Sequence, residues 1–372
     1  MTKISLDGGI QIRTYRPPAA FDPLTASAAD LMKYGFPQRP TDPVHLTRYQ
    51  RVFGQLKHKF QYIEPTFRIN ADRVHGPRRR LPEAGTETST NWSGGVVFAP
   101  KGQSFKWIEG DWVVPDVDAP TENQWFYCSS WIGIDGDGSA DVCQIGVECE
   151  AFRSARSTSR NIYPWWEWFP LPEMQITNFP VSPGDMVTML LCTTGANATT
   201  ASAFMTNRTT GASTSFSFDA PAGTKLVGNC AEWIVEAPTV GGSQSAIADY
   251  GEVFFSVCEA CLTDNTTVDG GTGNNINLTA NGQTVSDGNL ITSTVIQCLY
   301  VGTEPPQLVA VPDVFELSVP AASSSVHIAG LVPKFTGVNH TNSWVFSQSP
   351  LAGNRVAPGS TVNMVLHDGP RP

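Results

Sequence analysis

The middle of this chain has no histidine and few basic residues. The stretch from Glu87 to Glu304 carries 24 acidic side chains against 7 basic ones. All six histidines lie outside it, at His45, His58, His75, His327, His340 and His367. A serine or cysteine triad needs an imidazole base, and most catalytic zinc sites need histidine ligands. Chemistry in this segment must therefore depend on carboxylates and amides, which suit an acidic working pH.

The sequence also lacks any apolar run long enough to span a membrane. Its N-terminal residues lack the apolar region of a secretory signal peptide. On this ground alone, export by another route, a mis-assigned start and a location inside the cell all stay open. The family resemblance described below favours a secreted or cell-envelope protein.

Eight cysteines all fall within the acidic stretch, at Cys128, Cys143, Cys149, Cys192, Cys230, Cys258, Cys261 and Cys298. An even number permits disulfides in an exported protein, but the pairing cannot be read from the sequence. The Cys258-x-x-Cys261 motif has no second cysteine pair and no histidine partner, which disfavours a zinc or redox site. Ordinary disulfides and buried thiols are the two interpretations, and no metal or cofactor is expected.

Charge divides the chain into three parts. Residues 1–85 hold 14 basic and 7 acidic side chains, residues 86–304 hold 7 and 24, and residues 305–372 hold three of each. The net charges are therefore +7, −17 and zero. A segment at −17 repels nucleic acid, which excludes that class of partner. We expect a basic leader at 1–87, an acidic domain at 88–304 and a third unit at 305–372.

Hydrophobic periodicity predicts one early helix and many strands after it. Apolar residues recur at spacings of three and four between Pro43 and Phe60, as on one face of an amphipathic helix. Residues 1–40 are rich in proline and poorly periodic, and we expect a polar linker at about 81–90. From Asn91 onward, short runs of Val, Ile, Phe, Trp and Thr alternate with turn residues. This texture is typical of an all-β sandwich or jelly roll.

Two polar residues in predicted strands could carry chemistry. In a strand over 231–236, Glu236 shares a face with Glu232 and Ile234. In the strand around Gln144, the neighbouring Cys143 and Ile145 point to the opposite face. A Gln or Glu that points out of a strand is most often only solvated. Taken alone, these two residues therefore predict no site.

The order of the surrounding motifs gives them more weight. Five motifs follow one another: Asn91–Gly95 (NWSGG), Trp131–Asp137 (WIGIDGD), Cys143–Gly146 (CQIG), Trp165–Pro170 (WWEWFP) and Ala231–Glu236 (AEWIVE). In this order they resemble the glutamic peptidase (eqolisin) family over roughly residues 88–262. The resemblance implies an antiparallel β-sandwich similar to concanavalin A. Ile145 and Tyr163 depart from the family pattern, where Thr and Asp are common, which puts substrate specificity in doubt.

The resemblance also implies the roles of individual residues. Gln144 and Glu236 match the catalytic dyad. The predicted substrate-binding residues are Trp92, Trp131, Asp135, Trp165, Glu167 and Phe169. A carboxylate can activate water and later protonate the leaving amine, and an amide can stabilise the oxyanion. We therefore expect an acid-active endopeptidase that acts on proteins or peptides as a monomer.

Two other functions compete with this one. A glycoside hydrolase needs two carboxyl groups about 5–5.5 Å apart for retention or about 6.5–9.5 Å apart for inversion, which Glu167 and Glu236 on different strands could supply. A lectin-like module without activity would use the tryptophans as a platform for sugars. Much of the tryptophan is also needed for the core, and we expect Trp166 and Trp168 to be buried there.

The flanking segments carry expectations of their own. Residues 311–367 resemble a PASTA domain, with a short helix from Ala321 to Ala329 followed by three strands. That resemblance implies a small α+β module and a possible peptidoglycan partner, with passive stabilisation as the alternative. Glutamic peptidases are made with a basic propeptide, so we expect residues 1 to about 85 to cover the cleft and to be removed in acid. The alternative is a structural arm that is never cleaved.

Overall fold

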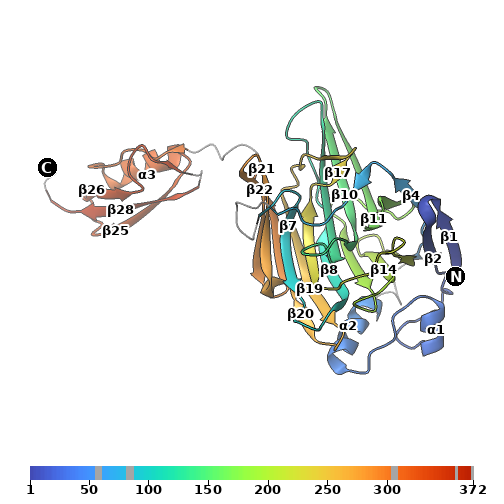
Figure 1. The fold of residues 1–372 in the computed structure, drawn as a ribbon. Helices are drawn as coiled ribbons and strands as arrows, with labels where there is room; N and C mark the ends of the chain where they lie inside the picture. Colours follow the sequence, from blue (N-terminus) through green and yellow to red (C-terminus); the bar gives the residue numbers. More distant parts are fainter. Residues whose placement is uncertain (55–60, 81–87, 303–308, 357–358, 370–372) are drawn as a thin grey trace. The chain divides into compact units, whose positions relative to one another are not determined.

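A computed structural model describes residues 1–54, 61–80, 88–302, 309–356 and 359–369 (Figure 1). It divides into two compact units, Met1–Gly302 and Thr303–Pro372. The first unit is an antiparallel β-sandwich, as the sequence predicts. Because the N-terminal segment lies within this unit, it packs as part of the sandwich. Among the described residues, no helix is long and apolar enough to cross a membrane.

One sheet of the sandwich carries most of the candidate site residues. We call it the site sheet, and all of its pairings are antiparallel. Its order is β4 (Phe67–Asn70), β12 (Glu173–Ile176), β11 (Thr158–Trp168), β10 (Cys143–Arg153), β9 (Trp125–Ile134), β16 (Cys230–Glu236), β7 (Trp92–Phe98) and β21 (Asn274–Ala280). The strands β10 and β16 both pair with β9, which brings two of the predicted motifs side by side.

The second sheet packs behind the first. Its order is β1 (Thr2–Leu6), β2 (Ile10–Thr14), β15 (Ala212–Asp219), β14 (Thr200–Asn207), β13 (Met186–Cys192), β8 (Phe105–Val113), β19 (Glu252–Leu262), β23 (Val295–Tyr300), β22 (Gln283–Thr292) and β21. One end of β21 pairs with β7 and the other with β22, so this strand joins the two sheets along one edge.

Shorter elements complete this unit. Next to the sheets lie β3 (Gln61–Tyr62), β6 (Thr88–Ser89), β20 (Thr267–Asp269) and the 3-10 turns Asp7–Gly9 and Gly270–Thr272. A small separate sheet consists of β5 (Arg73–Val74), β17 (Thr239–Val240) and β18 (Ser243–Gln244). It fixes the chain just before His75 against the loop that follows β16.

The alternation of side chains along β10 and β11 separates the core from the site. Ile145, Val147, Trp166 and Trp168 lie in the large hydrophobic cluster between the sheets. The expectation that both tryptophans are core residues is therefore confirmed. Residues of opposite parity, such as Gln144, point to the other face of the site sheet. There a second apolar cluster, which contains Trp92, Trp131 and Trp165, surrounds the polar residues.

The core tryptophans give a direct test of this packing. Trp166 is fully buried and lies 4.1 Å, between ring centroids, from Phe218 of the opposite sheet. We expect Trp166→Ala to lower the free energy of unfolding by about 3–5 kcal/mol, because it removes buried surface and leaves a cavity. Trp125→Ala is the matched control, since that side chain is 37% exposed. Denaturant unfolding that shows equal losses for the two variants would contradict this assignment of the core.

The N-terminal segment is more ordered than the sequence predicts. Residues 1–40 were expected to be irregular, yet they form β1, β2 and the helix α1 (Ala28–Lys33). The alternation of Ile10 and Ile12 is too short to indicate a strand from the sequence. The strand β2 is stabilised by its pairing with β15. The segment also adds β4 to the site sheet, so it extends an edge of each sheet.

The predicted amphipathic helix is α2 (Pro43–Gly54), and residues 55–60 lie outside the described part of the chain. Its residues Tyr49 and Phe53 pack against Leu190 and Phe204 on the outer face of the second sheet. The helix also brings two arginines to acidic side chains of the sandwich, in the ion pairs Arg51–Glu109 and Arg48–Glu259. Basic leader and acidic sandwich therefore meet through specific ion pairs. Most of the linker expected at 81–90 lies outside the described residues.

The second unit contains a helix and a three-stranded sheet. The helix α3 (Val319–Ile328) buries Ala322 and Val326 in the small core of this unit. The sheet order is β25 (Val332–Gly337), β28 (Thr361–His367) and β26 (Trp344–Ser349), and the short strands β24 (Val309–Ala310) and β27 (Arg355–Val356) pair beside it. The predicted helix and three strands are thus all present.

All eight cysteines are free thiols, and seven of them are buried. Of the two interpretations left open by the sequence, the structure corresponds to buried thiols. Burial raises the pKa of Cys128, Cys143 and Cys149 well above the usual value of a thiol. These side chains therefore act as small apolar core residues.

Candidate active site

Gln144 and Glu236 lie on the same face of the site sheet and are fully enclosed, with 0% and 1% of each residue exposed. Gln144 is on β10, opposite Gly133 of β9 and opposite Glu167 of β11. Glu236 is the last residue of β16, opposite Ser129 of β9. The two side chains are thus held on either side of β9.

The carboxylate of Glu236 is oriented by three side chains. The indole Nε1 of Trp131 donates to Oε2 at 3.0 Å, and the amide Nδ2 of Asn91 donates to Oε1 at 3.3 Å. The imidazole Nδ1 of His75 lies 3.3 Å from Oε2. Burial raises the pKa of Glu236, although the hydrogen bonds from His75, Asn91 and Trp131 oppose that rise.

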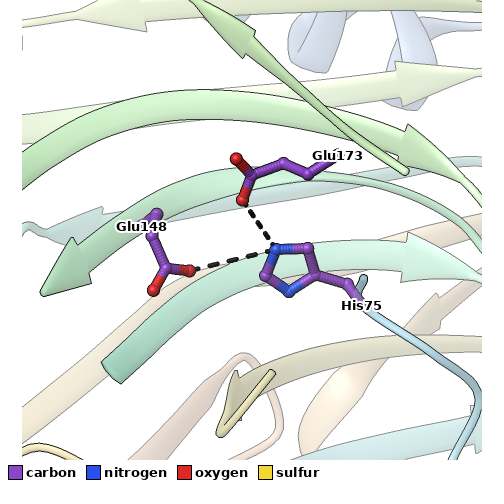
Figure 2. A group of neighbouring side chains, drawn as sticks. All are labelled: His75, Glu148 and Glu173. Carbon is purple, nitrogen blue, oxygen red and sulfur yellow. Dashed lines mark hydrogen bonds and ion pairs between the residues drawn. The ribbon is translucent and has the colours of Figure 1, made fainter. Parts of the chain in front are cut away.

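His75, from the N-terminal segment, occupies the centre of the site. Its ring is fully buried and stacks on Trp165, with ring centroids 3.8 Å apart and an interplanar angle of 9°. Its Nε2 lies 2.9 Å from an oxygen of Glu173 and 3.9 Å from one of Glu148, and Figure 2 shows both carboxyl groups directed to this one nitrogen. The ring therefore fills a pocket that is flat on one side and acidic on two others.

The backbone of His75 is held as well. Its N–H donates to the carboxylate of Glu167 at 3.0 Å, and its carbonyl accepts from the Nε2 of Gln144 at 2.5 Å. Gln144 and Glu236 therefore both contact one residue of a peptide segment, Gln144 through the backbone and Glu236 through the side chain. This is the central geometric feature of the site.

We call residues 73–80 the strap, because they run across this face as one continuous segment. After His75, the carbonyls of Gly76 and Pro77 accept from Nδ2 of Asn91 at 3.3 and 3.2 Å. Arg78 then forms an ion pair with Asp137 at 2.7 Å. On the other side of His75, Arg73 donates to Glu150 and to the hydroxyl of Tyr163.

Four carboxyl groups surround the imidazole of His75, those of Glu148, Glu167, Glu173 and Glu236. Burial by itself lowers the pKa of His75, but the hydrogen bonds to Glu173 and Glu236 outweigh it and raise the pKa to about 10. Burial raises the pKa of Glu148 to about 8 and that of Glu167 well above its usual range, while the charge of His75 lowers both. The ring is therefore a cation at neutral pH.

His75, Glu148 and Glu173 also offer one ligand atom each within 4.8 Å of one another, as a metal site requires. A metal ligand must be a neutral imidazole. Both ring nitrogens of His75 already face carboxyl oxygens, Nε2 at 2.9 Å from Glu173 and Nδ1 at 3.3 Å from Glu236, so we describe this group as an ion-pair cluster.

Comparison with known proteins now identifies the family. The family model described as Peptidase A4 family matches residues 90–300, more than half of the 372 residues. This chain belongs to the Peptidase A4 family. The match includes Gln144, Glu236 and the acidic pocket, whereas the strap precedes it.

Two curated relatives share part of this Peptidase A4 sequence. Aspergillopepsin-2 of Aspergillus niger is 28% identical over 192 residues, which are 47% of this chain and 65% of the relative. Scytalidopepsin B of Scytalidium lignicola is 26% identical over 160 residues, 43% of this chain and 56% of the relative. The alignments thus span less than two thirds of either relative.

Among solved structures, scytalido-glutamic peptidase with a transition state analog inhibitor is similar with a TM-score of 0.49 and 24% identity, over 57% of this chain and 98% of that one. Aspergilloglutamic peptidase from Aspergillus niger is similar with a TM-score of 0.42 and 28% identity, over 47% of this chain and 99% of that one.

The other residues predicted for this Peptidase A4 site fall into two groups. Trp92, Trp131 and Trp165 form one cluster with Phe169 packed against it, next to Glu236 and His75. Asp135 lies elsewhere. Its carboxylate accepts from the backbone N–H groups of residues 227–229, at 2.7–2.9 Å, and so anchors a loop. We therefore assign Asp135 a structural role.

The sequence did not indicate four residues of the site, His75, Asn91, Glu148 and Glu173. Asn91 begins the first family motif, but nothing showed that its amide would hold Glu236. Glu148 lies four residues after Gln144 on the same face of β10, and that spacing is a usable signal. Glu173 and His75 are not in any of the motifs, and only the pairing of β12 with β11 and the path of the strap bring them together.

Proposed function

We propose that this member of the Peptidase A4 family is an acid-active endopeptidase in which Gln144 and Glu236 carry the reaction. The observation that supports it most is the position of His75. A peptide carbonyl lies on the amide of Gln144, and the same residue contacts the carboxylate of Glu236. A substrate held in this way would present its carbonyl carbon to a water molecule activated by Glu236.

In the proposed reaction, the Glu236 carboxylate takes a proton from water while the water oxygen adds to the carbonyl carbon. The amide of Gln144 donates to the oxygen that becomes negative. Its Oε1 has no hydrogen-bond partner among the described residues, which leaves it able to accept from that water. The carbon–nitrogen bond then breaks as Glu236 returns its proton to the leaving amine, and the products are an acid and an amine.

Asn91 and Trp131 would position Glu236 in this reaction. Both donate to its carboxylate, one to each oxygen, and both lie on strands or loops fixed by the sheet. Donation to the charged form opposes the effect of burial on the pKa of Glu236. Burial still leaves the pKa of Glu236 above its usual value, so activity is expected to fall in strong acid as this base becomes protonated.

We also propose that the N-terminal segment is an intramolecular inhibitor. The strap contacts both members of the buried dyad, and its own peptide groups use the hydrogen bonds that a substrate would need. The helix α2 and the strands β2 and β4 attach the rest of the segment to the sandwich. Activity would then require release or cleavage of the strap.

For the C-terminal unit we propose a PASTA-like module that binds peptidoglycan. A helix on a three-stranded sheet fits that module, and two exposed aromatic rings, Phe315 and Phe346, flank Trp344. Exposed aromatic rings beside one another suit carbohydrate rings and apolar peptide stems.

The peptidoglycan proposal predicts that the full-length protein co-sediments with insoluble peptidoglycan and that Phe346→Ala reduces the bound fraction by roughly tenfold, as for an interface hot spot. Phe254→Ala, at an exposed aromatic of the sandwich, is the matched control. Equal sedimentation of both variants, or none of the unsubstituted protein, would instead support a passive role for this unit.

A further inference from the structure

We propose that the pocket bounded by Glu148, Glu173 and Trp165 is the subsite for the residue whose carbonyl is attacked, and that it selects histidine. This inference rests on the proposed peptidase function and gives its substrate class: peptide bonds on the carboxyl side of a histidine. The bond that breaks is the one between the histidine carbonyl carbon and the next nitrogen, and Glu236 returns its proton to that nitrogen as the amine leaves.

The first step of the argument is the position of the backbone. Glu167 accepts from the N–H of His75 at 3.0 Å and Gln144 donates to its carbonyl at 2.5 Å, so both peptide groups of this residue are fixed by groups of the sandwich. These contacts do not depend on the identity of the side chain. Any residue bound through the same two groups would direct its side chain into the pocket that His75 fills.

The second step is the shape of that pocket. The imidazole ring lies parallel to the indole of Trp165 at stacking distance, and ring, indole and both carboxyl groups have no exposed surface. A flat side chain of one ring therefore fits between the indole and the acidic residues, whereas a long flexible chain would lose its conformational freedom there. Stacking of a cation on the face of an indole adds further stabilisation.

The third step is the charge of the pocket. Neither oxygen of Glu148 has a hydrogen bond among the described residues, although the residue is fully buried. The described hydrogen-bond and ion-pair partners of Glu148 and Glu173 all come from the N-terminal segment, from Asn70 and His75. Without the strap the pocket therefore keeps two buried carboxyl groups and loses its cation. A buried carboxylate without a partner is costly, which favours a ligand that brings a positive charge.

Arginine is accommodated elsewhere in the same segment. Arg73 lies two residues before His75 and is directed to Glu150 and Tyr163. Its guanidinium also lies 4.8 Å from the ring centroid of Tyr127. The strap thus places Arg73 at Glu150 and His75 near Glu148, which are different carboxyl groups of β10. The histidine pocket is therefore separate from the site that holds the longer side chain.

Selection should depend on pH in a definite way. A histidine of a free peptide is charged below about pH 6.5. The groups that face its ring are Glu148, Glu167, Glu173 and Glu236, with Arg73 nearby. Burial raises the pKa of Glu148 and of Glu167, so these two carboxyl groups lose their charge first as the pH falls. The preference for histidine over a neutral ring of similar shape is therefore expected to be greatest at intermediate acidity and to decline toward pH 2–3.

The test uses the full-length chain after incubation in acid and a series of quenched fluorescent peptides that differ at one position, with His, Phe, Asn, Lys or Arg. We expect kcat/KM for the His peptide to exceed that for the Phe peptide by about tenfold or more at pH 5, since a matched charge replaces an unpaired one. Mass spectrometry should place the cut directly after the histidine. Cleavage of all peptides at equal rates, or before the histidine, would overturn the inference and leave the proposed function standing.

Substitution of the pocket residues provides an independent test of the inference. The double variant Glu148→Gln with Glu173→Gln should lose about 10- to 100-fold in kcat/KM for the His peptide and little for the Phe peptide. Glu150→Gln is the matched control, because that carboxylate contacts Arg73 and not His75. Unchanged selectivity in the folded double variant would count against the pocket. The series on the unsubstituted chain decides the matter if that variant does not fold, and no cleavage of any peptide at any pH would refute the peptidase function itself.

Discussion

Replacement of Glu236 by glutamine is expected to lower kcat/KM toward a denatured protein by about 100- to 10,000-fold at pH 3–5. Glutamine keeps the shape of the side chain and can still bond to Asn91 and Trp131, but it cannot take a proton from water. Gln144→Ala should cost about 100- to 1,000-fold, because one donor to the oxyanion is lost. Both losses should appear mainly in kcat, since the groups act in the transition state.

The same strand offers a matched control. Glu232 lies four residues before Glu236 on β16, is equally buried and has no hydrogen bond to either carboxyl oxygen among the described residues. Burial raises the pKa of Glu232 well above its usual value, so the side chain is already neutral in acid. Glu232→Gln should therefore keep nearly full activity. Full activity of folded Glu236→Gln, or an equal loss in Glu232→Gln, would show that the base has been misassigned.

An assay of polysaccharide hydrolysis with the same variants separates the peptidase proposal from the glycosidase alternative. The glycosidase alternative would use Glu167 and Glu236, which both contact His75. Under the peptidase proposal, the acid-treated protein degrades denatured protein and leaves polysaccharide intact. Hydrolysis of polysaccharide that disappears in Glu236→Gln would instead support the glycosidase.

The sequence predicts the fold well where the hydrophobic pattern is determined by local rules. Period-two alternation along β10 and β11 places Ile145 and Trp166 in the core and Gln144 on the opposite face. The helix α2 begins at Pro43, where proline suits the first turn. The strands β1 and β2 are missed because each is five residues long. In addition, β2 pairs with a strand about 200 residues later, and β1 pairs with β2.

The site is predictable only in part, for a related reason. Motifs identify residues such as Gln144 and Glu236 that the Peptidase A4 fold places together. His75 lies outside the matched region, and a single histidine near a basic run has no pattern of its own. Its position depends on how β4 and β5 pair with strands of the sandwich, and such long-range pairing leaves no local trace.

The second large effect concerns latency. We expect His75→Ala to abolish the delay before full activity when the full-length protein is diluted from neutral pH to pH 5 and assayed with a short peptide. The substitution removes a buried cation from four carboxyl groups and removes its stacking on Trp165. Loss of one partner of a buried ion pair costs about 3–5 kcal/mol, so the docked strap should be weakened by two orders of magnitude or more.

The dependence on pH follows from the sign of each shift. The pKa of His75 is raised to about 10 in the docked state, above its value of about 6.5 in a free chain, so its contribution is complete below pH 6.5 and is lost as the pH rises through 10. Its charge lowers the pKa of Glu148, Glu167 and Glu236 relative to the same site without it. Burial still keeps the pKa of each of these groups above its usual value in the docked state, and protonation of a facing carboxylate removes one of the charges that hold the His75 cation. The unsubstituted strap should be held most tightly at a pH where His75 is protonated and the facing carboxyl groups are ionised, and it should be released in acid.

His45→Ala is the control for this prediction. His45 is on the same N-terminal segment, but it is only half-buried, and its ring lies against the backbone carbonyl of Asn265 and not against a carboxyl group of the site. It should leave the delay unchanged, and electrophoresis at each time point will separate release of an intact segment from its cleavage. If His75→Ala shows the same delay as the unsubstituted protein, the strap does not control access to Glu236. In that case the N-terminal segment is a structural part of the sandwich, held by β2, β4 and α2, and substrate must reach the dyad by another path.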